Sequence, residues 1–188
     1  MRNTGIAVFV AVCMLSALAA AVCAQTPFVA VYFDNTYQQQ SMIYYGDCPP
    51  FGTFDTLYVA AVNFNMFMAG IEYKIDYGNN VAWLTDVPTS PVSIGISPTG
   101  ISLGWNLPQN GFKAVLCQTT LVQWICDGCQ FTNDPITVMG HPLFNPTPVA
   151  VRFPDYVEVP GVGLTALTCP TIAVEESTWG AVKSLYLD

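Results

Sequence analysis

The sequence predicts an all-β protein, and specifically an antiparallel β-sandwich. Its 14 glycines and 14 prolines recur between short runs rich in Val, Ile, Tyr, Phe and Thr, which is typical of strands joined by turns. In Ile71–Asp76 and again in Ile101–Trp105, apolar residues alternate with small or polar ones, as in a strand with one buried face. Helical periodicity is nearly absent, so the crossover helices that a parallel sheet needs are missing.

Eleven segments carry this strand signal, in chain order. They are Phe28–Phe33, Thr56–Phe64, Gly70–Asp76, Val81–Leu84, Val92–Ile96, Ile101–Trp105, Gly111–Thr119, Leu121–Cys126, Ile136–Met139, Val149–Phe153 and Leu164–Cys169. Together they are expected to form one domain, residues 25–170, because no linker or repeat divides them.

The first 24 residues have the pattern of a signal peptide. Met1 and Arg2 precede the apolar run Ile6–Ala21, and the small residues Val22–Ala24 form a cleavage site. A membrane anchor is the alternative, but the apolar run is short for a span of about 20 residues. A lipid anchor on Cys23 is a weaker alternative. Residues 1–24 are therefore expected to be removed, which predicts a secreted protein, extracellular or periplasmic.

The C-terminal residues 171–188 differ from the rest of the chain. Trp179, Val182 and Leu185 fall at helical spacing, and Ser177 can cap the first turn. We expect a tail with a short amphipathic helix, which either covers the edge of its own domain or contacts another molecule.

Composition excludes several classes of function. Aliphatic, aromatic and Cys residues make up 52% of the chain and charged residues 10%, so the protein is not disordered. Five basic residues against 13 acidic ones give a net charge of −8, and no basic cluster is present to bind nucleic acid. The remaining partners are an extracellular protein or a neutral polysaccharide, and self-association is a further alternative.

Four segments resemble a known family. They are Tyr58–Asn63, Ala69–Tyr77, Ile101–Trp105 and Gly111–Lys113. In this order they are similar to the cohesin family and to the wider group of carbohydrate-binding-like β-sandwiches, which implies a cohesin- or immunoglobulin-like fold with a jelly roll as the alternative topology. The segment Glu175–Tyr186 also resembles the tails of uncharacterised secreted proteins from uncultured bacteria.

Five cysteines follow the signal peptide, and export predicts that they are oxidised. The disulfide candidates are Cys48, Cys117, Cys126, Cys129 and Cys169. Because five is an odd number, at least one stays unpaired, and spacing alone does not select the pairs.

Cys126-Asp127-Gly128-Cys129 has three interpretations. Asp-Gly favours a β-hairpin turn between Leu121–Ile125 and Gln130–Thr132, with the two cysteines opposite each other. A redox pair would need a helix after the first cysteine, and none is indicated. Half of a zinc site would need further ligands such as His141. The structural turn is the favoured interpretation.

Aromatic residues near the loops are the candidates for ligand binding. Tyr37, Tyr44, Tyr45 and Tyr77 lie beside Gln, Asn and Gly residues, and their rings can stack on a sugar while amides bond its hydroxyls. Packing without a binding role is the alternative interpretation. The candidates for the core are Trp83, Trp105, Trp124 and Tyr73.

No complete catalytic signature is present. His141 is the single histidine, no G-x-S-x-G motif accompanies it, and the acidic residues suggest no defined pair. No cofactor is expected, although loops at Asp34–Thr36 and Asn133–Asp134 offer oxygens for a calcium ion. We expect a secreted, non-enzymatic module that binds a protein or glycan; a subunit of a surface layer or fibre and a metal-dependent hydrolase are the alternatives.

Overall fold

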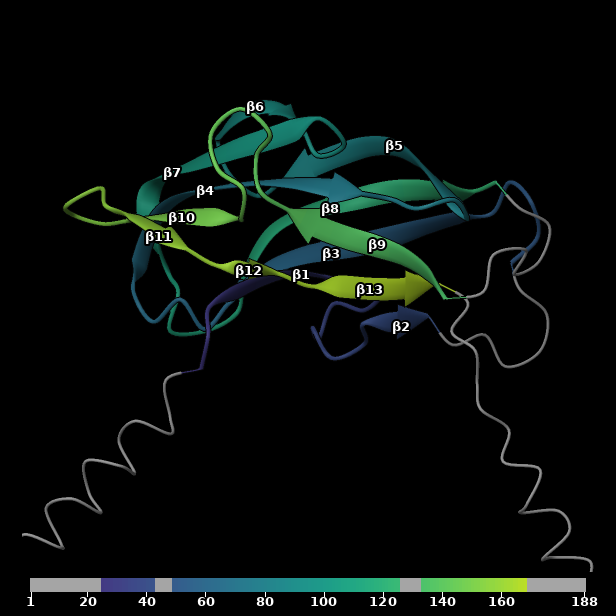
Figure 1. The fold of residues 1–188 in the computed structure, drawn as a ribbon, viewed down its shortest axis with the longest axis horizontal. Coiled ribbons are helices and arrows are strands. Elements are labelled where there is room, and N and C mark those ends of the chain that lie inside the picture. Colours follow the sequence, from purple (N-terminus) through teal and green to yellow (C-terminus); the bar gives the residue numbers. More distant parts are fainter. Residues whose placement is uncertain (1–24, 43–48, 126–132, 169–188) are drawn as a thin grey trace, which may run out of the picture.

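The structure is a computed structural model that describes residues 25–42, 49–125 and 133–168, and these form two stacked β-sheets (Figure 1). In these ranges every regular element is a strand, and none is a helix able to cross a membrane. The predicted all-β sandwich is therefore confirmed.

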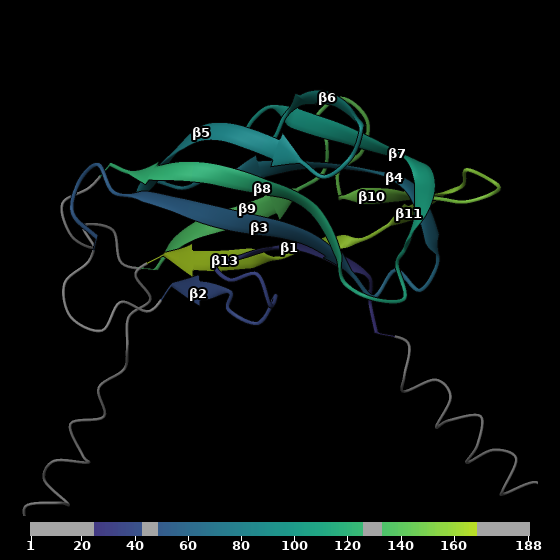
Figure 2. The ribbon, with the colours of Figure 1, turned by 180° about the vertical axis from the view of Figure 1, so that it is seen from behind.

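The first sheet has the strand order β12-β1-β3-β8-β5. Its strands are β1 (Phe28–Tyr32), β3 (Phe54–Val62), β5 (Val81–Pro88), β8 (Val115–Trp124) and β12 (Val162–Gly163). Neighbours are antiparallel except β1 and β12, which run parallel. Figure 2 shows β5, β8 and β3 across the front of the molecule.

The second sheet has the order β11-β10-β4-β9-β13-β2, with β7 also pairing to β4 and β6 pairing to β7. Its strands are β2 (Ser41–Met42), β4 (Phe67–Asp76), β6 (Val92–Ile96), β7 (Gly100–Asn110), β9 (Asp134–Met139), β10 (Val149–Arg152), β11 (Glu158–Pro160) and β13 (Thr165–Thr168). Because Gly70–Glu72 pair with both β10 and β7, these two strands occupy opposite edges of β4. The outer surface of β4 is therefore flanked by β7 on one side and by β10 on the other.

The inner faces of the two sheets meet in one hydrophobic core. Ile71, Tyr73 and Ile75 of β4 are at most 1% exposed, while Glu72 and Lys74 between them are half-buried on the outer side. The predicted alternation in this strand is confirmed. It fixes the register, because a slip by one residue would bring the charged set into the core.

The tryptophans divide into two kinds. Trp124 is fully buried, as is Tyr73, whereas Trp83 and Trp105 pack against the core but remain partly exposed. The prediction that Trp83, Trp105, Trp124 and Tyr73 belong to the core is thus correct for Trp124 and Tyr73. It is correct only in part for Trp83 and Trp105.

A bulge in β8 changes which side chains face inward. Val59 pairs with Gln118 and Ala60 pairs with Leu116, so Cys117 is an extra residue with no partner on β3. As a result both Cys117 and Gln118 are fully buried.

Several strand boundaries differ from those expected. The expected strands Gly111–Thr119 and Leu121–Cys126 are one strand, β8, because Thr119 and Thr120 both pair with β3 and β5. The short strands β2, β11 and β12 carry no recognisable alternation and were not predicted. The strand Val92–Ile96 has the predicted bounds.

The expected hairpin around Asp127-Gly128 involves residues 126–132, which lie outside the described residues, so it stays a prediction. Within the described part of the chain, Val122 of β8 pairs with Asp55 on one side and with Trp83 on the other. The next described strand, β9, belongs to the other sheet.

Several predictions concern parts of the chain outside the described residues. These are the signal peptide 1–24, the tail helix within 171–188, Tyr44 and Tyr45, and Cys48, Cys126, Cys129 and Cys169. They stay predictions.

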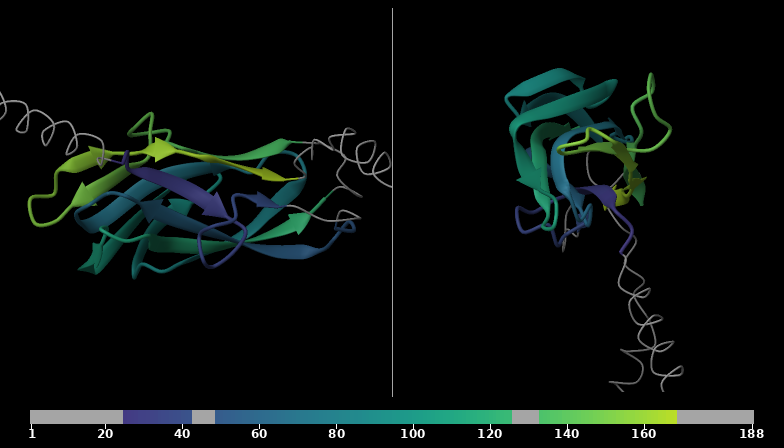
Figure 3. Two further views of the ribbon diagram at one scale, coloured as in Figure 1. Left: turned by 90° about the horizontal axis from the view of Figure 1, so that it is seen from below. Right: turned by 90° about the vertical axis from the view of Figure 1, so that its left-hand side faces the viewer.

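The two long sides of the sandwich are closed differently. Between β12 and β13, Leu164 donates its amide to Val29 of the first sheet and accepts a bond from Val138 of the second, at 2.9 and 3.2 Å. The sheets therefore join at this seam, which lies beside β1 in the view from below (Figure 3). On the opposite side, β5 and β6 are the last strands of their sheets.

Candidate functional site

The outer face of β4 and its neighbours carries a row of residues with little side chain. Gly70 of β4 pairs with Gly104 of β7, Gly104 pairs with Val92 of β6, and Gly70 pairs with Val151 of β10. Directly paired residues share one face of a sheet. Gly70 is buried, whereas a Cβ at Gly104 would meet nothing closer than Val92 Cβ at 3.7 Å, so the depression in the sheet surface lies at Gly104.

A bulge in β7 builds one wall of this depression. Met68 pairs with Gln109 while Gly70 pairs with Gly104, so β7 has several extra residues between these two positions. The extra segment 105–108 leaves the regular ladder, and its Leu107 is 76% exposed. Bulges of this kind re-aim side chains at the rim of a sheet.

An aromatic loop after β10 builds the facing wall. Phe153 and Tyr156 pack edge to face, with ring centroids 6.2 Å apart and an interplanar angle of 81°. Tyr156 has a left-handed backbone (φ 57°), and Arg152 forms an ion pair with Asp155 across the loop at 2.6 Å. The hydrogen bond from Arg152 lowers the pKa of the Asp155 carboxyl below its ordinary value, so the pair stays charged at neutral pH.

The walls and the floor enclose a hollow of about 230 Å³, which we call the glycine hollow. It is lined by Ala69, Val92, Gly104, Trp105, Asn106, Pro108, Phe153 and Tyr156. The lining is mostly apolar and open to solvent: Val92 is 49% exposed, Phe153 41% and Tyr156 65%. Asn106 supplies an amide at its rim.

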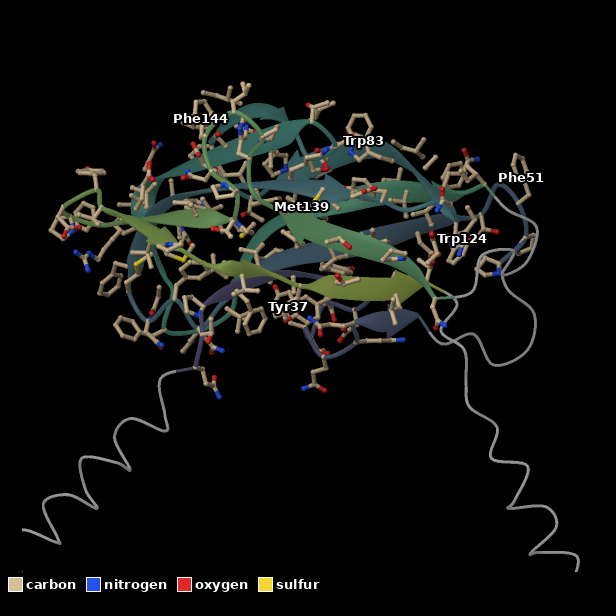
Figure 4. All side chains as sticks on the ribbon, in the orientation of Figure 1. Tyr37, Phe51, Trp83, Trp124, Met139 and Phe144 are labelled. Atoms are coloured by element: carbon tan, nitrogen blue, oxygen red, sulfur yellow. The ribbon has the colours of Figure 1, made fainter. Side chains whose placement is uncertain are left out.

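A second hollow, of about 460 Å³, lies at the other end of the same face and is called the Lys74 hollow. Lys74 of β4, Met139 of β9 and the loop after it line this space. In that loop His141 stacks on Phe144 with ring centroids 4.6 Å apart, and Leu143 donates its amide to His141 Nδ1. Figure 4 shows Phe144 projecting from this loop at the top of the molecule.

Polar groups separate the two hollows. Glu72 accepts a hydrogen bond from Ser102 Oγ at 3.0 Å, and both side chains lie on the outer face between Gly70 and Lys74. Gly70 and Lys74 are four residues apart on β4, which corresponds to about 13 Å. The face therefore offers the apolar glycine hollow and the more polar Lys74 hollow, with the Glu72 carboxylate between them and the Lys74 ammonium group lining the second.

The two predicted ligand-binding tyrosines that the structure describes, Tyr37 and Tyr77, lie elsewhere. Tyr37 packs edge to face on Tyr32 at 5.7 Å and helps to cover a small cluster of Ala30, Tyr32 and Ala60 on the outer side of the first sheet. Burial raises the pKa of the Tyr37 hydroxyl, consistent with a ring packed against the protein. Tyr37 and Phe144 lie on opposite sides of the molecule in Figure 4.

Tyr77 is a core residue, 7% exposed, and not part of an open surface. Its hydroxyl shares a hydrogen bond of 2.6 Å with Ser97 Oγ, and burial raises its pKa above the usual range. The sequence placed Tyr77 beside Gly78 and Asn79 and thus near a loop. Since residues 71, 73 and 75 face inward, the period of two also carries Tyr77 into the core.

A network of hydrogen bonds around Asp86 connects the two sheets near Tyr77. The Asp86 carboxylate accepts bonds from Trp83 Nε1, Gln118 Nε2 and Thr120 Oγ1 on the first sheet, at 2.9 to 3.0 Å. It also accepts bonds from the amide and hydroxyl of Ser97 beside β6, at 2.7 and 2.8 Å. These donors occupy the carboxylate, so its role is to join the sheets.

Cys117 is a free, fully buried thiol, consistent with the expectation that at least one of the five cysteines is unpaired. Desolvation raises the pKa of the thiol to about 12, which keeps it protonated and unreactive in the folded protein. The bulge in β8 turns this residue into the core.

The described residues hold no group of three or more His, Cys, Asp or Glu side chains that could bind a metal. Asp34 accepts bonds from the amides of Gln38 and Gln39, and Asp134 from those of Asn79 and Asn80. Each carboxylate thus serves as an acceptor within its own turn or between neighbouring loops. The calcium expectation stays a prediction.

The residues of the glycine hollow were not proposed as a site from the sequence. The alternation in Ile101–Trp105 does put Gly104 on the outer face, but its contact with Gly70 depends on pairing between distant segments. Phe153 was assigned to a strand end and Tyr156 to no element. The aromatic pair Phe153 and Tyr156, close to Pro154 and Pro160, was the one signal available.

No protein-family model and no curated protein matches the sequence. Among solved structures, the cohesin CaCohA2 of Clostridium acetobutylicum, in complex with CaDoc0917, has a TM-score of 0.50 at 11% identity, over 78% of this chain and 100% of that chain. The third ScaB cohesin of Ruminococcus flavefaciens, in complex with a group 1 dockerin, gives 0.48 at 12%, over 77% and 95%. The cohesin module of a Clostridium perfringens family 33 glycoside hydrolase gives 0.47 at 7%, over 77% and 98%. The chain thus has a cohesin-like β-sandwich fold.

Proposed function

We propose that this chain is a secreted, non-enzymatic module that binds a protein partner on the outer face of β6, β7, β4 and β10. The observation that carries the proposal is the glycine hollow, in which Gly104, without a side chain, lies between an aromatic loop and a strand bulge. A surface without side chains at its centre and with exposed aromatic rings at its rim is suited to receive an apolar side chain of another protein.

The charges on this face favour a protein partner. Glu72 and Lys74 lie next to each other on the outward side of β4, so a partner can be oriented by one basic and one acidic group. The apolar glycine hollow supplies the buried contact. The fold resembles that of cohesins, among which CaCohA2 is found in complex with CaDoc0917, and this likeness supports protein binding. It does not identify any residue of the binding site.

Secretion is part of the proposal because of the N-terminal segment. The apolar run Ile6–Ala21 followed by small residues is the pattern of a cleaved signal. Extracellular or periplasmic export also suits a chain with many cysteines.

The absence of catalytic function is proposed on two grounds. The single histidine, His141, is 8% exposed and packed on Phe144, and its Nδ1 accepts a backbone amide. Asp86, the most heavily hydrogen-bonded carboxylate described, joins the two sheets. Neither group is free to act as a general base.

A neutral glycan is the alternative occupant of the same face. The rings of Phe153 and Tyr156 together with the amide of Asn106 could stack on and bond a sugar. The two occupants respond differently to charge. A Lys74→Ala variant weakens binding of a charged protein surface and leaves binding of a neutral sugar unchanged.

The proposal is tested by filling the glycine hollow. A Cβ at Gly104 would lie 3.7 Å from Val92 Cβ, an ordinary contact, so Gly104→Leu fits the fold while its side chain occupies the hollow. The wild-type protein is used to capture and identify a partner from the native secretome. The partner is then purified and titrated calorimetrically against both proteins. We expect Gly104→Leu to weaken binding about 100-fold, as loss of a central contact does.

Thr56→Leu is the matched control, since it adds similar apolar bulk at an exposed position of β3 on the other sheet. Its affinity should equal that of the wild-type protein. Equal affinity of Gly104→Leu and wild type would refute the proposed face, and the same loss in both variants would point to a general effect on the fold.

A further inference from the structure

The strand β6 is an open sheet edge of an unusual kind. It pairs with β7 alone, and all five of its residues are exposed. Val92, Ile94 and Ile96 are 49%, 69% and 40% exposed. Figure 1 shows β6 on the outer rim of the second sheet, beyond β7. Exposed apolar edge strands pair readily with other strands.

The other edge strands of the described part of the chain are protected. β2 and β12 are two residues long, β11 carries Glu158 and Pro160, and β5 carries Asp86 and Pro88. Short length, charge and proline are the usual means of blocking edge pairing. β6 has none of these within its five residues, although Pro91 and Pro98 lie just outside it.

The charges around β6 indicate which kind of partner pairs with this edge. From Val87 to Phe112 the sequence contains no charged residue, while the whole chain has a net charge of −8. Two acidic copies repel each other over most of their surfaces, so they can approach closely only at an uncharged region. A basic partner would be drawn to the acidic surfaces and not to this segment. Charge therefore favours a second copy of the same chain.

The backbone of β6 has hydrogen-bonding groups free for such pairing. Val92 and Gly104 both donate their amides to Ser90 Oγ at 3.1 Å, so the amide of Val92 points toward β7. Because backbone groups alternate in direction along a strand, the amide and carbonyl groups of Ser93 and Gly95 then point to the open edge. Gly95 has a left-handed backbone (φ 85°), which bends the end of the strand and limits the pairing to a short segment.

We infer that two copies of this chain form a closed dimer by antiparallel pairing of their β6 strands about a two-fold axis at Ile94. Ser93 of each copy then exchanges backbone hydrogen bonds with Gly95 of the other, and the two Ile94 side chains lie opposite each other. The contact is isologous, so it ends at two copies and does not grow into a fibre. It leaves the outer face with its hollows accessible on both copies.

Charge substitutions at Ile94 test this arrangement in the full mature chain. Because the position is 69% exposed, Ile94→Lys and Ile94→Glu should fold normally, which circular dichroism checks. In sedimentation equilibrium the mass of the wild-type protein should rise with concentration toward twice that of the monomer. Each variant alone should dimerise about 100-fold more weakly, since like charges face each other at the axis. An equimolar mixture of the two should regain the dimer, because Lys then faces Glu.

Val162→Lys is the control, as Val162 is an exposed residue of the edge strand β12, and this variant should dimerise like the wild type. A wild-type protein that stays monomeric at every concentration would overturn the inference. So would dimers that survive both Ile94 variants, a mixture that stays monomeric, or oligomers that continue to grow beyond two copies. Partner binding is measured separately, so failure here leaves the proposed function standing.

Discussion

The outer faces of the two sheets differ in whether other parts of the chain cover them. On the first sheet, the chain after β1 folds back so that Tyr37 lies on Tyr32 and, with Tyr58 and Leu164, helps to bury Ala30 and Ala60. On the second sheet, Gly104 of β7 lines an open hollow, and the rings of Phe153 and Tyr156 stand beside it exposed. Side chains of the same chain thus cover Ala30 and Ala60 on the first sheet, whereas no described side chain covers Gly104 on the second.

The contrast shows why small residues on a sheet surface have two meanings. Ala30 and Ala60 make room for a loop of the same chain, so the depression is filled and adds to stability. Gly104 lines a hollow that no described side chain fills. An unfilled apolar depression of this kind indicates a binding surface.

The largest expected effect is on the free energy of unfolding, when a charged residue is placed on the outer face of each sheet in turn. Ala60 is fully buried beneath the covering residues, so Ala60→Asp should lower the free energy of unfolding by about 3–5 kcal/mol, since the charge has no partner. Gly104→Asp on the open face should change it by less than about 0.5 kcal/mol. Urea denaturation of both variants measures the difference. Equal losses would mean that the two faces are equally covered.

The smallest expected effect concerns Asp34, in the loop that carries Tyr37. Hydrogen bonds from Thr36, Gln38 and Gln39 hold the pKa of this carboxyl below its ordinary value of 3.8. A lowered pKa in the folded state stabilises the fold above pH 3.8, and this contribution disappears as pH falls through the folded pKa. Since Asp34 lies at the surface and is only partly buried, the contribution is small.

Thermal unfolding of wild type and Asp34→Asn across this range checks the linkage. The wild type should have the higher Tm at neutral pH, with the difference shrinking below about pH 4. A constant difference at all pH values would mean that the carboxylate charge has no part in holding the loop.

The fold could be predicted because its signals are local. Alternation in Ile71–Asp76 fixes which side of β4 is buried, and the strand Val92–Ile96 is bounded by prolines in the sequence itself. Splitting β8 at Thr119 failed because two adjacent polar residues resemble a turn, whereas Thr120 points inward and bonds Asp86.

The candidate site could not be predicted in the same way, because it is made by contacts between distant segments. Gly104 lies beside Phe153 and Tyr156 only because β4 pairs with both β7 and β10, and the bulge that aims Trp105 depends on the pairing of β4 with β7. Tyr37 was predicted to bind a ligand for a related reason. The sequence of a loop tyrosine beside glutamines is the same whether its ring is exposed or packs on Tyr32. Which partner a residue meets decides its role.

The central claim is that the partner binds the open face of the second sheet and not the covered face of the first. Hydrogen exchange of the purified complex, followed by mass spectrometry, tests it most directly. We predict slower exchange on partner binding in the β7 bulge at 105–108 and in the loop 153–157, with no change in the loop 33–40. Slower exchange in 33–40 with 105–108 and 153–157 unchanged would contradict the claim.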